Sequence, residues 1–196
     1  MDKRVIGCTG GIGSGKSAVV AAFAALGIPA YDCDSRAKAL YDEDQDLCRK
    51  VAGLLGSDVL MADGRLDRKA MAARLFADKE LLKQLEAIVH PAVAADFLKW
   101  AEAQASDIVV LESAILFQTP FFDNFADCTI AVSAPKEVRI KRVMHRDCLS
   151  RAQVEARMAS QWSDAQREAR ADVVIVTDDE HPVLPQILEL IDKLKK

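Results

Sequence analysis

The sequence lacks both the long apolar run of a membrane protein and the basic excess of a nucleic-acid binder. Its longest uncharged run, from Ser17 to Tyr31, is shorter than a membrane span and is interrupted by a glycine and a proline. The net charge is −4 at pH 7, whereas general nucleic-acid binders carry a surplus of lysine and arginine. We therefore expect neither a nucleic-acid partner nor a membrane partner.

Cysteine spacing argues against a disulfide framework and against a zinc site. The chain has five cysteines, an odd number with no C-x-x-C pair. They are Cys8, Cys33, Cys48, Cys128 and Cys148. Met1 is followed almost at once by an apolar run, so no signal peptide is predicted. We expect a cytoplasmic protein with reduced thiols; nothing in the sequence sets the oligomeric state, and a monomer is favoured.

The 196 residues, 51% hydrophobic and 29% charged, predict one globular domain with subdomains. Short apolar runs that predict strands alternate with longer runs that predict helices. The predicted strands are 5–8, 30–32, 108–111, 129–132 and 173–176, and the predicted helices are 16–26, 135–144 and 182–195. Near-continuously apolar strands are typical of a buried parallel sheet with helices on its faces. The pattern therefore predicts an α/β fold.

Two segments interrupt this alternation. Residues 35–104 have helical periodicity broken by the turn Ala62-Asp63-Gly64, which indicates a helical insertion beside the sheet. Residues 145–170 are polar and contain several arginines, which is typical of a mobile flap or lid. The sheet core is then formed by residues 1–34, 105–144 and 171–196.

A glycine-rich loop lies between the first predicted strand and helix. From Gly10 the sequence reads GGIGSGKS, which fits the phosphate-loop pattern G-x-x-x-x-G-K-[ST] in its required strand–loop–helix context. The alternative is a glycine-rich turn with a solvated lysine, which would need neither a strand before it nor a helix after it. The residues expected to contact ATP here are Gly10, Gly11, Ile12, Gly13, Ser14, Gly15, Lys16, Ser17 and Ala18.

The chemistry of such a loop suits a polyphosphate. Glycines allow positive φ and a close backbone approach, so that successive N–H groups can surround an anion. The following helix adds N–H donors and the positive end of its dipole. Lys16 can reach the β- and γ-phosphates, and the Ser17 hydroxyl can ligate Mg²⁺. The loop therefore predicts ATP as co-substrate, with Mg²⁺ as its metal.

Two aspartates, Asp32 and Asp34, follow the second predicted strand. The carboxyl ends of parallel strands face the ligand crevice, and residues i and i+2 of an extended segment project to one side. One carboxylate can accept the proton of an acceptor hydroxyl while the other assists Mg²⁺. The alternative is a helix N-cap for the segment that begins near Ser35, and which aspartate is the base stays open.

An arginine face follows the fourth strand. Arg139, Arg142 and Arg146 have the spacing i, i+3, i+7, and Ile140, Val143 and Met144 form the opposite apolar stripe. Arginines near a nucleotide site can stabilise charge on the transferred phosphoryl group, although such a face can also be merely solvated. The position at the start of the flap favours a phosphate role for Arg142 and Arg146; Arg139 stays undecided.

At this point the chain resembles the dephospho-coenzyme A kinase family. The resemblance spans nearly the whole sequence, from TGGIGSGKS through the Asp-x-Asp pair to an ordered series of further motifs. These are Asp63-Gly64-Arg65-Leu66-Asp67-Arg68, Val89-His90-Pro91, Lys141-Arg142 with Arg146-Asp147, and Ala171-Asp172-Val173-Val174-Ile175. The loop alone indicates only a phosphate-loop protein, whereas the ordered series is much more specific.

The resemblance implies ATP-dependent phosphorylation of the ribose 3′-hydroxyl of dephospho-CoA, the last step of CoA synthesis. It also implies a three-layer phosphate-loop fold: a five-stranded parallel sheet, a helical CoA-binding subdomain at 35–104 and a lid at 145–170. Other small-molecule phosphate-loop kinases, acting on a nucleoside, shikimate or gluconate, are the alternative. A GTPase is disfavoured because its D-x-x-G and [NT]-K-x-D motifs are absent.

The same resemblance assigns roles to single residues. It gives Asp34 as the base with Asp32 as its acidic neighbour, and Lys16 and Arg142 as phosphate clamps with Arg146 close to them. Ser17 would hold Mg²⁺, with Asp32 as a second candidate. Arg68 and His90 would bind the CoA substrate, although a histidine next to a proline at a helix end can simply cap carbonyls.

Two positions depart from the family pattern. Gln118 stands where the family has glutamate, so Glu112 is a candidate to supply that carboxylate. Thr177 stands where asparagine is common, which puts a side-chain contact with adenine in doubt. Neither position belongs to the phosphate loop or to the aspartate pair, and the predicted activity does not depend on them.

Overall fold

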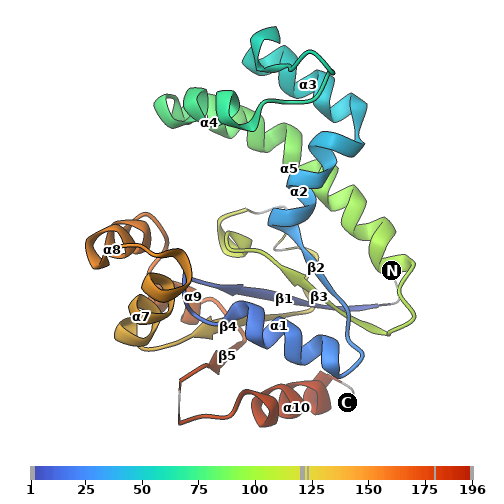
Figure 1. The fold of residues 1–196 in the computed structure, drawn as a ribbon. Coiled ribbons are helices and arrows are strands. Elements are labelled where there is room, and N and C mark those ends of the chain that lie inside the picture. Colours follow the sequence, from blue (N-terminus) through green and yellow to red (C-terminus); the bar gives the residue numbers. More distant parts are fainter. Residues whose placement is uncertain (1–2, 120–121, 123, 179, 195–196) are drawn as a thin grey trace. The chain divides into compact units, whose positions relative to one another are not determined.

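The computed structural model describes residues 3–119, 122, 124–178 and 180–194 (Figure 1). The chain divides into two compact units. The first consists of Met1–Asp32 with Gln104–Lys196 and contains the sheet; the second is Cys33–Ala103 and is helical. No helix within the described residues is both long and apolar enough to cross a bilayer.

The sheet of the first unit has five parallel strands in the order β2-β3-β1-β4-β5 (Figure 1). The strands are β1 (Arg4–Gly10), β2 (Ala30–Asp32), β3 (Ile108–Glu112), β4 (Cys128–Ser133) and β5 (Val173–Val176). Their apolar runs leave β1, β3 and β4 almost wholly buried. The predicted α/β fold with a five-stranded parallel sheet is confirmed.

Two helices cover one face of this sheet, α1 (Lys16–Ala25) and α10 (Val183–Leu194) (Figure 1). Val19 and Phe23 of α1 and Ile187 of α10 pack with Ile6 and Cys8 of β1 in one buried cluster. Each buried aliphatic or aromatic side chain of this kind contributes roughly 1.5–3 kcal/mol to stability. The helices thereby fix the carboxyl end of β1, where the glycine loop begins.

The opposite face of β1 packs against the segment after β3. A Cβ on Gly7 would lie 2.9 Å from Leu116 Cδ2 and 3.0 Å from Ala126 Cβ, so only glycine fits this close approach. Leu116 begins the short 3-10 helix η2 (Leu116–Gln118), in which Leu116 and Phe117 are buried. Gln118 itself is exposed.

Three of the described helices lie between β4 and β5: α7 (Lys136–Asp147), α8 (Arg151–Ala159) and α9 (Asp164–Glu168). Pro135 is the N-cap of α7, so the helix begins one residue later than predicted. It continues three residues beyond the predicted end at Met144, and Cys148 ends it in a left-handed conformation. Capping boxes at Ser150 and Ser163 start α8 and α9. Most of the predicted flap is therefore regular helix.

The side-chain pattern predicted for α7 is partly wrong. Ile140 and Val143 pack with Val154 of α8 as an apolar cluster, but Met144 is 37% exposed and lies outside it. Arg139 is only 3% exposed, so it does not belong to a solvated face. Tertiary contacts, and not helix periodicity alone, decide which of these side chains are buried.

The second unit consists of α2 (Cys33–Glu43), α3 (Gln45–Leu55), the short helix η1 (Ser57–Val59), α4 (Arg68–Ala77) and α5 (Lys79–Glu102). Asp44, Asp67 and Asp78 cap the starts of α3, α4 and α5 by accepting two backbone N–H groups each. His90 and Pro91 lie inside α5. The idea that they mark a helix end is therefore wrong.

Candidate active site

The glycine loop connects the end of β1 to the start of α1. Gly13 and Gly15 have φ of +76° and +93°, in the region that favours glycine, and Gly15 occupies the N-cap of α1. Gly15 offers no side-chain acceptor, and the first turn of α1 contains no acidic residue. The positive end of the helix is therefore left to interact with an anion.

A cavity of about 380 Å³ opens over this loop. Its lining consists of residues 10–17, Ala114, Arg142, Val143, Arg146 and Gln161. The structure therefore brings Arg142 and Arg146 together with the loop, as the sequence suggested for a phosphate site. Ala18, also expected to contact ATP, is exposed and is not part of this lining.

The Ser14 hydroxyl shows that the cavity wall suits a polar ligand. Ser14 is 1% exposed, and its Oγ has no hydrogen-bond partner among the described residues. Because a buried hydroxyl without a partner is costly, a phosphate oxygen is a chemically suitable occupant of the cavity.

Lys16 at the start of α1 forms an ion pair with Glu112, the last residue of β3. Lys16 Nζ lies 3.6 Å from Glu112 Oε1, and both side chains are less than 20% exposed. In the sheet register Glu112 is opposite Asp32 on one side and Cys8 on the other. Two carboxylate-bearing residues, Asp32 and Glu112, thus end adjacent strands.

The predicted geometry of Asp32 and Asp34 is wrong. Asp32 is the last residue of β2, and α2 already begins at Cys33, so Asp34 lies in a helical first turn and not on an extended segment. The i, i+2 argument for a shared side therefore does not apply. Asp34 remains an acidic residue near a helix N-terminus, where its charge is favourable.

Arg142 is held by Thr177, which follows β5. Arg142 Nη1 donates to Thr177 Oγ1 at 3.0 Å, and Nη2 donates to the Thr177 carbonyl at 2.8 Å. The Thr177 hydroxyl in turn donates to the Ser14 carbonyl at 2.5 Å. Thr177 therefore connects the phosphate loop to Arg142, which is a role that the sequence did not suggest.

Arg146 pairs with its neighbour Asp147. Arg146 Nε and Nη2 donate to the two Asp147 oxygens at 2.7 and 3.0 Å, and Arg157 lies 3.5 Å from the same carboxylate. The hydrogen bond from Arg146 is the main cause that lowers the pKa of Asp147. Arg146 lines the cavity, but its side chain is 63% exposed. It is therefore less constrained than Arg142, which Thr177 holds through two hydrogen bonds.

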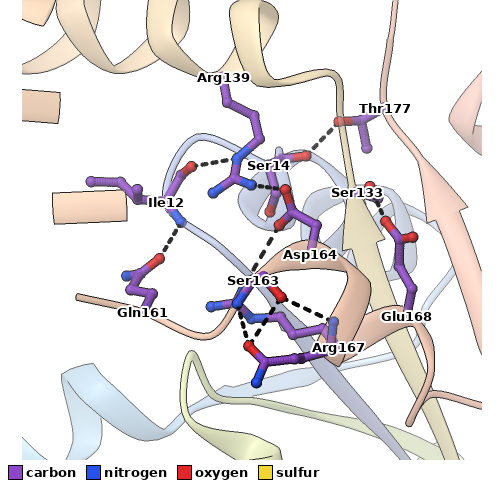
Figure 2. Close-up of polar contacts among 11 residues, drawn as sticks. Ile12, Ser14, Ser133, Arg139, Gln161, Ser163, Asp164, Arg167, Glu168 and Thr177 are labelled. Atoms are coloured by element: carbon purple, nitrogen blue, oxygen red, sulfur yellow. Dashed lines mark hydrogen bonds and ion pairs between the residues drawn. The ribbon is translucent and has the colours of Figure 1, made fainter. Parts of the chain in front are cut away.

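Gln161 and Arg139 contact the loop at Ile12 (Figure 2). The sequence left the role of Arg139 undecided and did not single out Gln161. Gln161 Oε1 accepts from the Ile12 N–H at 2.9 Å, and Arg139 Nε donates to the Ile12 carbonyl at 2.9 Å. Gln161 follows α8 in a polar stretch without periodicity, so no local signal could have identified it.

The residues expected to bind the acceptor, Asp34, Arg68 and His90, lie in α2, α4 and α5 of the helical unit. Arg68 Nη2 donates to the Lys38 carbonyl at 2.9 Å and to Asp42 Oδ2 at 2.5 Å. Burial lowers the pKa of His90, partly opposed by Glu86. A cavity of about 350 Å³ in this unit is lined by Pro91 but not by Arg68 or His90.

Cysteine reactivity provides a test of burial near the loop. Burial and then the Glu112 carboxylate raise the pKa of Cys8 to about 12, although Lys16 opposes this. Four of the thiols are buried and only Cys148 is exposed. We expect iodoacetamide at pH 8 to label Cys148 alone in the folded protein and all five after denaturation, as measured by mass spectrometry. Labelling of Cys8 in the folded protein would contradict the buried β1.

Comparison with known proteins identifies the family. The family model described as dephospho-CoA kinase matches residues 4–182. A dephospho-CoA kinase of Porphyromonas gingivalis is 41% identical over 97% of this chain and 94% of its own length. Among solved structures, Thermus thermophilus TT1252 is 32% identical, with a TM-score of 0.85 over 99% of this chain and 98% of its own. A Campylobacter jejuni dephospho-CoA kinase is 26% identical, with a TM-score of 0.58 over 99% of this chain and 98% of its own. The chain belongs to the dephospho-CoA kinase family.

Proposed function

We propose that this protein phosphorylates the ribose 3′-hydroxyl of dephospho-CoA with ATP, giving CoA and ADP. The observation that carries the proposal is the cavity over residues 10–17, with Lys16 and Arg142 in its wall, in a chain of this family. The loop provides backbone N–H donors, the Ser14 hydroxyl and a lysine for the phosphates of a nucleoside triphosphate.

Phosphoryl transfer depends mainly on positioning and on charge stabilisation. Lys16 and Arg142 hold the oxygens of the β- and γ-phosphates, and Arg146 adds a third cation. Asp34 accepts the proton of the ribose hydroxyl, and Asp32 assists it. Arg68 and His90 bind the remainder of the acceptor. Lys16 leaves Glu112 for the phosphates when the nucleotide binds.

Magnesium fits the oxygen donors at this sheet edge. The Ser17 hydroxyl lines the cavity, and Asp32 and Glu112 end adjacent strands. Mg²⁺ prefers phosphates and waters together with one or two protein oxygens, so a hydroxyl and one carboxylate are sufficient protein ligands. When bound, Mg²⁺ neutralises charge on the phosphates. Ser17 is its proposed ligand, with Asp32 or Glu112 acting through water.

The remaining expectations are also proposals. The core is assigned to residues 1–34, 105–144 and 171–196, the CoA-binding part to 35–104 and the lid to 145–170. We propose a cytoplasmic monomer whose partners are small molecules, without nucleic acid. Size-exclusion chromatography with light scattering tests the oligomeric state.

The decisive assay measures ADP release with Mg²⁺-ATP across four acceptors: dephospho-CoA, adenosine, shikimate and gluconate. We expect turnover with dephospho-CoA only, and a product with the mass of CoA, because the whole ordered set of motifs belongs to this family. Phosphate transfer to another acceptor and never to dephospho-CoA would contradict the proposal. A matched preparation with Lys16→Met controls for contaminating kinases, since it removes the lysine of the phosphate loop.

A further inference from the structure

A cluster of charged side chains lies against the phosphate loop, outside the lining of the nucleotide cavity. It consists of Arg139 in α7 and of Asp164 and Arg167 in α9 (Figure 2). Both arginine side chains are 3% exposed, and that of Asp164 is 30% exposed. Neither arginine lines the nucleotide cavity; Arg139 and Asp164 instead line a separate cavity of about 290 Å³.

The cluster contacts the loop at two consecutive residues. Arg139 Nε donates to the carbonyl of Ile12, whose N–H is bound by Gln161, so both polar groups of Ile12 have fixed partners. A Cβ on Gly11 would overlap the Arg139 guanidinium and lie 3.1 Å from Arg167 Nη1. The guanidinium groups therefore lie directly on the backbone of Gly11 and Ile12.

One carboxylate serves both guanidinium groups. Arg139 Nη1 forms an ion pair with Asp164 Oδ2, and Arg167 Nη1 lies 3.4 Å from Asp164 Oδ1. Burial and the nearby Arg139 lower the pKa of Arg167, opposed by Asp164. Arg167 Nη2 has no hydrogen-bond partner among the described residues. Asp164 therefore has to offset two buried positive charges, which are costly without a partner.

Asp164 is itself held in place by the rest of α9. Ser163 and Gln166 form a capping box around it, with the Ser163 N–H donating to Gln166 Oε1 at 2.9 Å. Glu168 Oε1 accepts from Ser133 Oγ, at the end of β4, at 2.6 Å. The helix that carries Asp164 is thus attached to the sheet through Glu168 (Figure 2).

We propose that Arg139 is a positioning residue for the nucleotide, which fixes the Ile12 peptide of the phosphate loop, and that Asp164 orients Arg139 for this task. The proposal rests on the proposed ATP site. Arg167 contributes less than Arg139 to positioning the loop. It lies next to Gly11 but makes no hydrogen bond to the loop within the described residues.

Two matched variants test this, Arg139→Gln and Arg167→Gln. Each removes one guanidinium and leaves the other paired with Asp164, so the two have the same charge balance. We expect Arg139→Gln to raise the Kd for ATP by roughly 10- to 100-fold, the usual effect of losing a charged hydrogen bond. Arg167→Gln should leave the Kd within about threefold. Calorimetry without acceptor measures both, alongside the melting temperature.

A third variant, Asp164→Asn, should weaken ATP binding like Arg139→Gln, while the acceptor KM stays unchanged; the first two variants keep the test valid if it does not fold. Equal ATP affinities for folded Arg139→Gln and Arg167→Gln would overturn the proposal. Because ATP binding is measured without acceptor, an error in the assigned acceptor would appear only in the turnover assay and not in this comparison.

Discussion

Replacing Asp34 with asparagine is expected to reduce the phosphorylation rate by roughly 10²- to 10⁴-fold, the usual contribution of a positioned general base. Asparagine keeps the shape of the side chain but cannot accept the ribose proton as a carboxylate does. Asp34 is exposed in the first turn of α2, where a negative charge favours the helix by about 0.3–1 kcal/mol, and an asparagine side chain can still accept hydrogen bonds there. We therefore expect nearly normal stability together with a large loss of turnover.

The measurements are the melting temperature, the ATP affinity and kcat, all on one preparation. ATP binding should be unchanged, because the proposed phosphate contacts come from residues 10–17 together with Arg142 and Arg146. Asp32→Asn is the matched control: it should cost less than Asp34→Asn if Asp32 only assists, and more if Asp32 is the base. Full activity of Asp34→Asn would remove it from the chemistry. Loss of stability together with activity would indicate a structural role.

The sheet and the phosphate loop were predictable because their signals are local. Five short apolar runs predicted the strands, and the GGIGSGKS stretch predicted the turn from β1 into α1. The positive φ of Gly13 and Gly15 follows from the same motif. Each of these features depends on residues within one segment, so periodicity and glycine spacing are sufficient.

The predictions that were wrong or missing concern residues whose environment is set by distant parts of the chain. Arg139 looked like one side of a polar helix face, but α9 covers it and provides Asp164. Pro91 suggested a helix end, yet α5 continues through it. Gln161 binds Ile12 across 149 positions of sequence. Such pairings require the folded chain, and no spacing rule contains them.

Replacing Arg142 with alanine is expected to lower kcat by roughly 10²- to 10³-fold, as for other groups that stabilise transition-state charge. Arg142 lies in the wall of the cavity, and Thr177 holds it through two of its N–H groups. A guanidinium has five N–H donors in a fixed fork, so this anchor leaves donors for phosphate oxygens. The acceptor KM should change less than kcat, because the lost interaction is strongest in the transition state.

Two further variants separate the charge of Arg142 from its anchor. Arg142→Lys keeps the positive charge but not the fork, so its kcat should fall between those of the wild type and Arg142→Ala. Thr177→Val removes two hydrogen bonds, the one from Arg142 Nη1 and the one to the Ser14 carbonyl, but keeps the bond from Arg142 to the Thr177 carbonyl. At about 0.5–1.5 kcal/mol for each lost hydrogen bond, kcat should fall by roughly 5- to 150-fold. Steady-state kinetics with both substrates varied measures these parameters. If Arg142→Ala turns over normally while Thr177→Val is impaired, Thr177 supports the loop independently and Arg142 has no part in phosphoryl transfer.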